Sequence, residues 1–320
     1  MRSENFLGQQ RSLFFTINLV QTHLKNNLLN MRHIPVQTIN LLFKNCSKSM
    51  LMLAGILTAS SMIGTPAQAQ VIGNDDRVTP DYNWMVNTGR QPIGRLEMKF
   101  ENGQYGSCSF TIVGRNIGIT NTHCVRDKNG KIATQIKAFS LQYGSRNFAS
   151  ANVDSVWTGL NRFPTTVNDF SRDWAVIRFN SNLGTTAGSY GNLGYSNSQS
   201  NLGSTVVNKS TNMIGYSGDW PTALAIRPGQ VRGQTPGAHF GCSITKVENG
   251  VLIHTCDGTP GSSGSSLSDT SKQVMGLHWG QLTYPNGVRV GGGVALERFM
   301  PAVQQLRSNG AASNSVVPIP

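Results

Sequence analysis

Charged residues are scarce in this 320-residue chain, since Asp, Glu, Lys and Arg together make up only 13% of it. Few stretches carry the regular charge pattern of a long helix exposed to solvent. Glycine, by contrast, is abundant, with 35 residues, and it favours turns over helix interiors. The composition therefore indicates a β-rich fold with many turns.

Acidic residues are especially few, with 15 Asp and Glu against 27 Lys and Arg, which gives a formal net charge of +12. The basic residues are scattered, and no stretch combines clustered Lys and Arg with interleaved aromatic side chains. Because such a stripe is typical of nucleic-acid-binding proteins, we expect no nucleic-acid partner. A solvated basic surface can still attract acidic substrates over a distance.

Only one long apolar run is present, at residues 51–64. It is too short to span a bilayer comfortably, because about 20 residues are needed. Lys44 and Lys48 precede the run, and the small residues Ala67 and Ala69 follow it, which is the pattern of an export signal. We therefore predict that residues 1–69 are a leader and that the mature protein is secreted, to the periplasm or the exterior, without stable membrane insertion.

Cysteines number only five, and no two have the C-x2-C spacing, which argues against a zinc site and for a protein without a bound metal. One of them, Cys46, falls in the predicted leader. Four cysteines then remain, and an even number in an exported protein predicts two disulfides. Short sequence separations favour the pairs Cys108–Cys124 and Cys242–Cys256.

The remainder of the chain divides into two β-rich parts. Short apolar and β-branched runs alternate with Gly, Asn and Ser turns, and a loose polar stretch at 184–204 interrupts them. We therefore expect one β unit over 70–190 and a second over 191–307. Apolar residues spaced by three and four predict a helix over 296–306, and the small, polar residues 308–320 predict a flexible tail.

Residues suited to amide hydrolysis occur at three separate places. The reaction needs a nucleophile, a base, a group that orients the base, and donors for the developing oxyanion. Ser263 lies in the string Gly-Ser-Ser-Gly-Ser, which permits a tight turn with its hydroxyl outward and two N–H groups inward. His123 follows an apolar strand, and Asp173 stands immediately before an alternating strand, where its carboxylate can be buried against the imidazole. Asp169 is a competing candidate.

The segments around these residues, in the order His, Asp, Ser, resemble the trypsin-like serine protease family, and the resemblance covers residues 71–306. Cys-Ser-Phe-Thr-Ile-Val-Gly-Arg-Asn at 108–116 and Thr-Asn-Thr-His-Cys at 120–124 match its strand, turn and His-Cys box. Asp-Trp-Ala-Val-Ile at 173–177 matches the Asp strand, and Cys-Asp-Gly-Thr-Pro-Gly-Ser-Ser-Gly-Ser-Ser at 256–266 matches the serine loop.

The resemblance implies an all-β fold of two antiparallel six-stranded β-barrels with a C-terminal helix. It implies a catalytic triad of His123, Asp173 and Ser263, with Ser263 as the nucleophile rather than its serine neighbours. The N–H groups of Gly261 and Ser263 are expected to form the oxyanion hole. Such a monomeric enzyme acts on protein or peptide substrates and requires no metal or organic cofactor.

Within that family, the chain is most similar to bacterial glutamyl endopeptidases. The similarity lies in Val-Ile-Gly-Asn-Asp-Asp-Arg at 71–77, Gly-Tyr-Ser-Gly-Asp at 215–219 and Gly-Leu-His-Trp-Gly at 276–280. It implies cleavage after Glu or Asp, with His278 contacting the acidic side chain. We expect Thr259 and the α-amino group of a processed Val71 to assist.

Two departures from that pattern leave alternatives open. The family often has a hydroxyl residue five positions before the nucleophile, where this chain has Gly258. Asp257 stands roughly where tryptic enzymes place the carboxylate that binds Lys or Arg, so tryptic specificity is the first alternative. A non-catalytic secreted binding module is the second, although such proteins usually lack one of the triad residues.

Ser262, the residue before the nucleophile, is also unusual. Digestive zymogens have an aspartate there, which a new amino terminus pairs with on activation. This route is closed to the present chain, and we expect trimming to Val71 to act through the specificity pocket instead.

Overall fold

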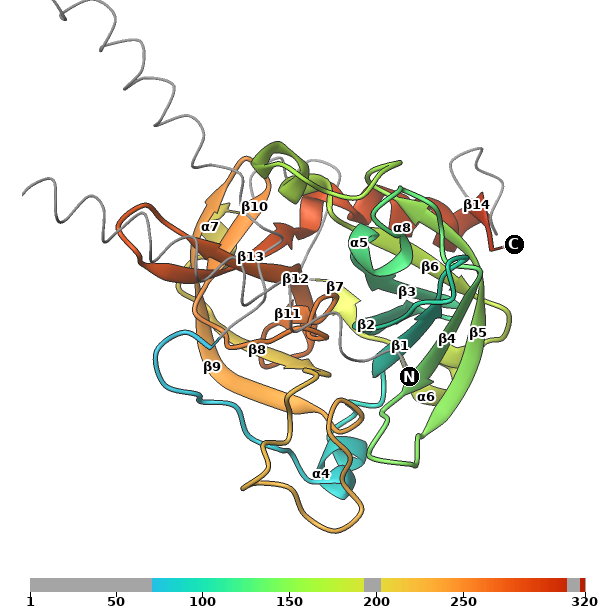
Figure 1. Ribbon diagram of the computed structural model, residues 1–320, viewed down its shortest axis with the longest axis horizontal. Coiled ribbons are helices and arrows are strands. Elements are labelled where there is room, and N and C mark those ends of the chain that lie inside the picture. Colours follow the sequence, from blue (N-terminus) through green and yellow to red (C-terminus); the bar gives the residue numbers. More distant parts are fainter. Residues whose placement is uncertain (1–70, 193–202, 310–316, 320) are drawn as a thin grey trace, which may run out of the picture. The chain divides into compact units, whose positions relative to one another are not determined.

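The computed structural model describes residues 71–192, 203–309 and 317–319. The predicted leader, residues 1–69, lies outside them. Strands predominate in the described part, and none of its helices is long and apolar enough to cross a membrane. Figure 1 shows the strands gathered into two groups that lie side by side.

The first barrel contains six antiparallel strands. They are β1 (Ile93–Lys99), β2 (Tyr105–Gly114), β3 (Ile117–Thr120), β4 (Gln135–Ser140), β5 (Ala149–Thr158) and β6 (Ala175–Phe179). Their order is β5-β4-β1-β2-β3-β6, and pairing of β5 with β6 closes the barrel. Buried and exposed residues alternate as the strand period requires: in β4, Ile136 and Ala138 are buried, whereas Gln135 and Lys137 are exposed.

The second barrel repeats this closure with six further antiparallel strands. They are β8 (Ser210–Gly215), β9 (Gly237–Glu248), β10 (Val251–His254), β11 (Ser266–Ser268), β12 (Gln273–Thr283) and β13 (Arg289–Ala295). The order is β11-β8-β9-β10-β13-β12, closed by pairing of β11 with β12. Short β7 (Gly191–Asn192) runs parallel to β12. The predicted pair of six-stranded barrels is therefore confirmed.

Glycines in β13 make room for two rings on the neighbouring strands. A Cβ atom at Gly291 would lie 2.1 Å from the ring of His254, and one at Gly292 would lie 2.3 Å from the ring of Trp279. Real Cβ atoms do not approach so closely. The glycine run thus fixes where these rings lie inside the second barrel.

Helices are short and occupy the connections between strands. They are α4 (Tyr82–Asn87), α5 (Thr122–Val125), η2 (Val167–Arg172), α6 (Leu183–Ala187), α7 (Gly203–Val206), η3 (Leu296–Arg298) and α8 (Met300–Asn309). The helix predicted over 296–306 forms as the 3-10 turn η3 followed by α8. Val303 and Leu306 of α8 face the core, and the Arg307 guanidinium donates to the carbonyl of Val113 in the first barrel.

One apolar cluster spans the junction of the two barrels. It includes Ile119 and Val176 from the first barrel and Ile214, Leu277 and Trp279 from the second. Burial of this shared surface holds the barrels together, since apolar burial stabilises by about 25 cal/mol per Å². Side chains at the edge of this junction therefore have fixed relative positions, which a site made from both barrels requires.

The last described residues lie against the first barrel. A flexible tail was expected over 308–320, of which 310–316 and 320 lie outside the described residues; β14 (Val317–Pro318) pairs with β5, with Val317 opposite Val156. The N–H of Ile319 donates to the carbonyl of Asp154 at 2.8 Å. Ile319 also packs against the core of the first barrel, and this burial outweighs the entropy cost of ordering a short tail.

Candidate active site

His123 is held by a short helix and a disulfide. It lies in α5, directly after β3, and Cys124 beside it is bonded to Cys108 of β2. Its Nδ1 lies 2.7 Å from Oδ2 of Asp173, and its backbone N–H donates to Oδ1 at 3.0 Å. With the carboxylate accepting at Nδ1, the other ring nitrogen, Nε2, is left unprotonated in the neutral ring. The predicted disulfide Cys242–Cys256 is likewise present in the second barrel.

Asp173 contacts the imidazole, whereas the competing Asp169 has another role. The side chain of Asp173 is only 2% exposed, and its backbone carbonyl accepts from the amide of buried Asn121 at 2.6 Å. Asp169 caps the 3-10 helix η2 together with Thr166 and pairs with both terminal nitrogens of Arg162. Burial raises the pKa of Asp169, but hydrogen bonds from the Thr165 and Thr166 amides and from Arg162 hold it below its usual value.

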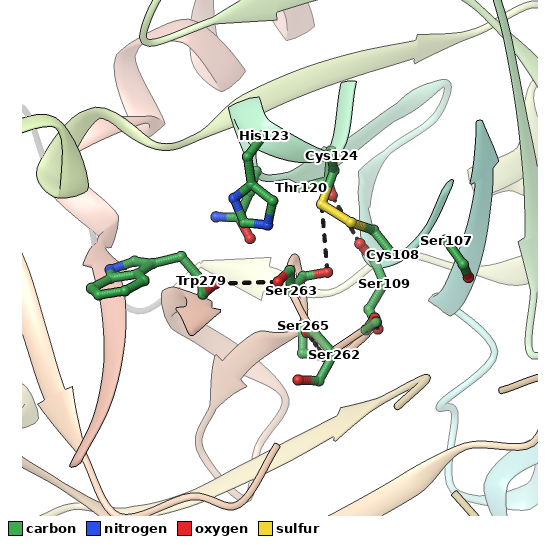
Figure 2. Close-up of a disulfide and its surroundings, with 12 residues drawn as sticks. Ser107, Cys108, Ser109, Thr120, His123, Cys124, Ser262, Ser263, Ser265 and Trp279 are labelled. Atoms are coloured by element: carbon green, nitrogen blue, oxygen red, sulfur yellow. Dashed lines mark hydrogen bonds between the residues drawn. A yellow bond between two sulfur atoms is a disulfide. The ribbon is translucent and has the colours of Figure 1, made fainter. Parts of the chain in front are cut away.

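Ser263 lies on a loop that is tied to both barrels. Its carbonyl accepts from the N–H of Ser109 in β2 at 2.8 Å, and the Sγ atom of Cys124 lies 3.8 Å from the same oxygen. Its hydroxyl donates to the carbonyl of Trp279 at 3.2 Å and, within the described residues, has no hydrogen bond to His123. Figure 2 shows the imidazole on the side of the loop where this hydroxyl lies. Catalytic hydrogen bonds often form only when substrate is present, and a serine side chain reorients easily.

Glycine is required next to Ser263. Gly264 has a φ of +88°, and a Cβ atom there would lie 2.1 Å from the carbonyl oxygen of Ser109. Both the left-handed backbone and the close approach exclude any other residue. The backbone of the loop therefore requires the second glycine of the Gly-Ser-Ser-Gly-Ser segment, independently of any role that the segment has in catalysis.

Two backbone N–H groups beside Ser263 remain without an acceptor. The carbonyl of Pro260 accepts from Gly218 N–H at 2.7 Å, which turns the N–H of the same peptide, that of Gly261, in the opposite direction. Neither Gly261 N–H nor Ser263 N–H donates to any described residue. Both N–H groups are free of protein partners among the described residues, so this pair is suited to receive an oxyanion.

A chain of hydrogen bonds sets the proton position on His278. Cys256 N–H donates to Nδ1 of His254 at 3.1 Å, so the proton of His254 is on Nε2. That nitrogen lies 3.1 Å from Nδ1 of His278, which must accept, so the proton of His278 is on its own Nε2. This Nε2 is buried and has no partner among the described residues.

Both histidines are neutral in the folded protein. Burial lowers the pKa of His254 to about 4 and lowers that of His278 well below its ordinary value. His278 therefore offers a hydrogen-bond donor rather than a positive charge. His254 was not predicted as a site residue from the sequence; its only signal was a histidine at the end of the apolar run Val-Leu-Ile-His at 251–254.

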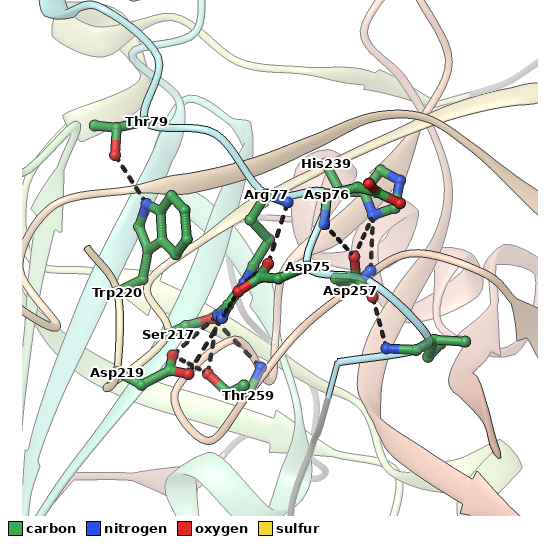
Figure 3. Close-up of polar contacts among 11 residues, drawn as sticks. Asp75, Asp76, Arg77, Thr79, Ser217, Asp219, Trp220, His239, Asp257 and Thr259 are labelled. Carbon is green, nitrogen blue, oxygen red and sulfur yellow. Dashed lines mark hydrogen bonds and ion pairs between the residues drawn. The ribbon is translucent and has the colours of Figure 1, made fainter. Parts of the chain in front are cut away.

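Asp257 binds the N-terminal segment. Its side chain is fully buried, and it accepts from the N–H groups of Ile72 at 2.8 Å and Asp76 at 3.0 Å (Figure 3). Nδ1 of His239 lies 3.1 Å from its Oδ2. Burial raises the pKa of Asp257, but hydrogen bonds from His239 and the two amides hold it below its ordinary value. Val71, half-buried, directly precedes this docked segment.

Thr259 and Gly258 lie shortly before Ser263. Thr259 was predicted to contact substrate, and in the structure its hydroxyl donates to Asp219 and accepts from Arg77 at 3.1 Å. Gly258 leaves no space for the hydroxyl side chain found elsewhere in the family. A Cβ atom there would lie 3.0 Å from Nε2 of His278 and 2.5 Å from Oγ of Ser262.

Two groups of described residues bring ligand-type atoms within 4.8 Å of one another. In the first, Cys108 and Cys124 flank His123, but both sulfurs belong to a disulfide and cannot bind a metal. The second contains Asp76, His239 and Asp257. Its carboxylate at Asp257 is already occupied by two amides and an imidazole, so a cation would have to displace them.

Comparison with known proteins identifies the class. The model of the trypsin-like peptidase domain matches residues 106–277, and the chain belongs to this family. The predicted family and fold are thus both confirmed.

Particular relatives are more distant. The chain is 24% identical over 210 residues to the glutamyl endopeptidase of Staphylococcus aureus strain MRSA252, covering 66% of this chain and 52% of that protein. The enzyme of strain MW2 has the same identity, with 57% of it covered. The chain thus spans little more than half the length of these curated relatives.

Solved structures share the fold. One is a Glu endopeptidase in complex with MPD, with a TM-score of 0.57 and 23% identity, covering 75% of this chain and 100% of that one. Another is the thermostable serine protease AL20 from an extremophilic microorganism, with a TM-score of 0.51 and 17% identity, covering 71% and 100%.

Proposed function

We propose that the protein is a serine endopeptidase with His123, Asp173 and Ser263 as its triad. The observation that carries the proposal is the 2.7 Å contact between the imidazole and the buried carboxylate, adjacent to the serine loop. This contact fixes the proton on Nδ1 and leaves Nε2 to act as the base. The carboxylate also stabilises the imidazolium once it forms.

The reaction begins when the hydroxyl of Ser263 leaves the Trp279 carbonyl and turns to Nε2 of His123. As Oγ attacks the scissile carbonyl carbon, its proton passes to Nε2, and the substrate oxygen becomes an oxyanion. The N–H groups of Gly261 and Ser263 receive that oxyanion, each contributing about 3 kcal/mol in the transition state. The imidazolium then protonates the leaving amine, and water, deprotonated by His123, releases the acyl group from Oγ.

Cleavage after Glu is the specificity we propose. The unpartnered Nε2–H of His278 is a donor suited to a carboxylate, and the two-histidine chain prevents its proton from moving to Nδ1. A neutral donor alone does not offset the burial of a carboxylate. The α-amino group of processed Val71, which precedes the segment bound by Asp257, would supply a positive charge and with it the remaining stabilisation of the carboxylate. The curated relatives are named as glutamyl endopeptidases.

Tryptic specificity is the weaker candidate. It requires the carboxylate of Asp257 to face a basic substrate side chain. That carboxylate instead accepts two backbone N–H groups of the N-terminal segment. We therefore propose that Asp257 supports the wall of the pocket and leaves the substrate contact to His278.

We further propose that residues 1–69 direct export and that the enzyme acts as a secreted monomer on protein or peptide substrates. Two disulfides support an oxidising compartment.

The test is a panel of peptides that differ only at the residue before the cleaved bond. We expect the highest kcat/KM with Glu, a lower value with Asp, and little cleavage after Lys or Arg. Ser263→Ala, which removes only the hydroxyl, is the control and should abolish turnover with every peptide. Preferential cleavage after Lys or Arg would overturn the proposed specificity, whereas full turnover by the Ser263→Ala variant would overturn the proposed nucleophile.

A further inference from the structure

Arg77 is a charged residue buried near the candidate site. Its side chain is 2% exposed, although it comes from the N-terminal segment ahead of both barrels. Its Nε and one terminal nitrogen each donate to Asp75 at 2.8 Å, and the terminal nitrogens also donate to Asp219 at 2.9 and 3.1 Å. The guanidinium lies over the ring of Trp220, 4.8 Å from its centre. Figure 3 shows Arg77 beside Asp219 and Thr259.

Besides Asp75, the hydrogen-bond partners of Arg77 belong to the two loops that set the Pro260–Gly261 peptide. Asp219 directly follows Gly218, whose N–H holds the carbonyl of Pro260 at 2.7 Å. On the other loop, Arg77 donates to the hydroxyl of Thr259, the residue before Pro260. One guanidinium therefore binds both sides of the contact that directs Gly261 N–H toward the substrate oxygen.

The geometry of this contact suits arginine and no other residue. Two carboxylates and a hydroxyl accept from one planar group, and a lysine ammonium cannot donate to all of them in that arrangement. Burial alone would lower the pKa of Arg77, but the hydrogen bonds that it donates to Asp75 and Asp219 hold the pKa above its ordinary value. The charge is permanent at every pH at which the protein is folded.

Ser262 shows why such a contact is needed. Digestive enzymes of this family use an aspartate before the nucleophile, paired with a free amino terminus, whereas the hydroxyl of Ser262 donates locally to the carbonyl of Thr259 at 2.8 Å. Ser262 therefore offers no carboxylate with which a new amino terminus could pair. Arg77 provides a charged contact through its side chain, so this contact does not require a processed amino terminus.

We propose that Arg77 is a positioning residue that orders the oxyanion hole by joining the loop of residues 217–220 to the loop of residues 257–261. This proposal rests on the proposed peptidase function and adds that the oxyanion hole forms without a free amino terminus. The α-amino group of Val71 then affects the preference for Glu, while Arg77 affects kcat with any substrate.

The test uses Arg77→Met and Arg77→Lys in the full chain, with peptides that have Glu or Gln before the cleaved bond. We expect Arg77→Met to lower kcat at least ten-fold with both peptides, because a misdirected oxyanion donor costs ~100-fold or more. KM should change less than kcat. Arg77→Lys should recover only part of the loss, because it restores the charge without the planar arrangement of donors.

A loss caused by general destabilisation would look different. Arg178→Met, which removes a guanidinium paired with Asp154 in the first barrel, is the matched control and should leave kcat per active site unchanged. If Arg77→Met does not fold, Asp219→Asn is measured in its place, since Asp219 is 49% exposed and its loss disturbs the core less. We expect a several-fold lower kcat for this variant.

The outcomes separate the two proposals. Wild-type kcat in a folded Arg77→Met variant would overturn the positioning role and leave the peptidase function intact. If Arg77→Met does not fold, wild-type kcat in the folded Asp219→Asn variant would have the same meaning. Absence of turnover by the wild-type chain would overturn the peptidase function itself. A precursor that retains residues before Val71 should react with a fluorophosphonate at the rate of the processed chain; a rate at least ten-fold lower would also overturn the proposal.

Discussion

At His278, the proton position is decided by the neighbouring His254. The N–H of Cys256 fixes the tautomer of His254, and His254 fixes that of His278. The buried Nε2–H of His278 has no partner among the described residues, so it can bind an acceptor such as a carboxylate and disfavours a donor. Under the proposed function, selectivity is therefore a property of this two-ring chain rather than of one side chain.

Replacement of His254 by Phe tests this chain. Phe keeps a ring opposite the glycines of β13 but cannot donate to His278, whose proton can then move to Nδ1. We expect the ratio of kcat/KM for Glu over Gln peptides to fall about ten-fold, the value of one hydrogen bond to a charged group. His278→Gln should cause a similar fall, and the double variant should add little to either. An unchanged ratio in the His254→Phe variant would show that the chain does not control selectivity.

At the scale of elements, sequence patterns predicted most of the features that depend on residues close together in the chain. Alternating strands, the His-Cys box, the serine loop and both disulfide pairings follow from short-range spacing, and the structure contains all of them. The contact between Asp173 and His123 was also expected, from the place of the aspartate before its strand and from the family resemblance, and it is present.

Long-range contacts explain what the sequence did not reveal. The N-terminal segment reads as a simple start of the mature chain, yet Ile72 and Arg77 bind residues more than 180 positions away. Similarly, Thr259 has the right type and spacing for a substrate ligand, and only the fold brings Arg77 and Asp219 to its hydroxyl. Val317 of β14 pairs with Val156 of β5, which lies far earlier in the chain, so no local pattern indicates this pairing either.

At the scale of the whole molecule, the site lies at the junction of the barrels. His123 and Asp173 come from the first barrel, Ser263 and His278 from the second, and the apolar cluster between them fixes their relative positions. The second barrel contains the buried imidazoles of His254 and His278, and their protonation links the stability of the fold to pH.

We predict that the protein loses stability as the pH falls. The pKa of His254 is about 4 in the folded protein, against an ordinary value of 6.5, so between these values the unfolded chain binds a proton that the folded one does not. Stability is therefore greatest above about pH 6.5 and falls toward pH 4, with roughly 3 kcal/mol lost through this group. The lowered pKa of His278 acts in the same direction, and those of Asp219 and Asp257 extend the loss below their ordinary value of 3.8.

Urea unfolding at pH 7.5, 5.5 and 4.5 measures this dependence. We expect the midpoint to fall at each step, and to fall less steeply in the His254→Phe variant, which lacks the buried imidazole. A wild-type midpoint that is constant across the three pH values would contradict the assignment of neutral, buried histidines.

Stoichiometric labelling with a fluorophosphonate, followed by mass spectrometry of the peptides, tests the nucleophile most directly. The reagent forms a covalent bond only with a serine that a base activates and an oxyanion hole faces. We predict one label per chain, located on Ser263, with no labelling after replacement of His123 by Ala. Absence of any label on the folded chain, or a label on Ser262 or Ser265 instead, would contradict the account.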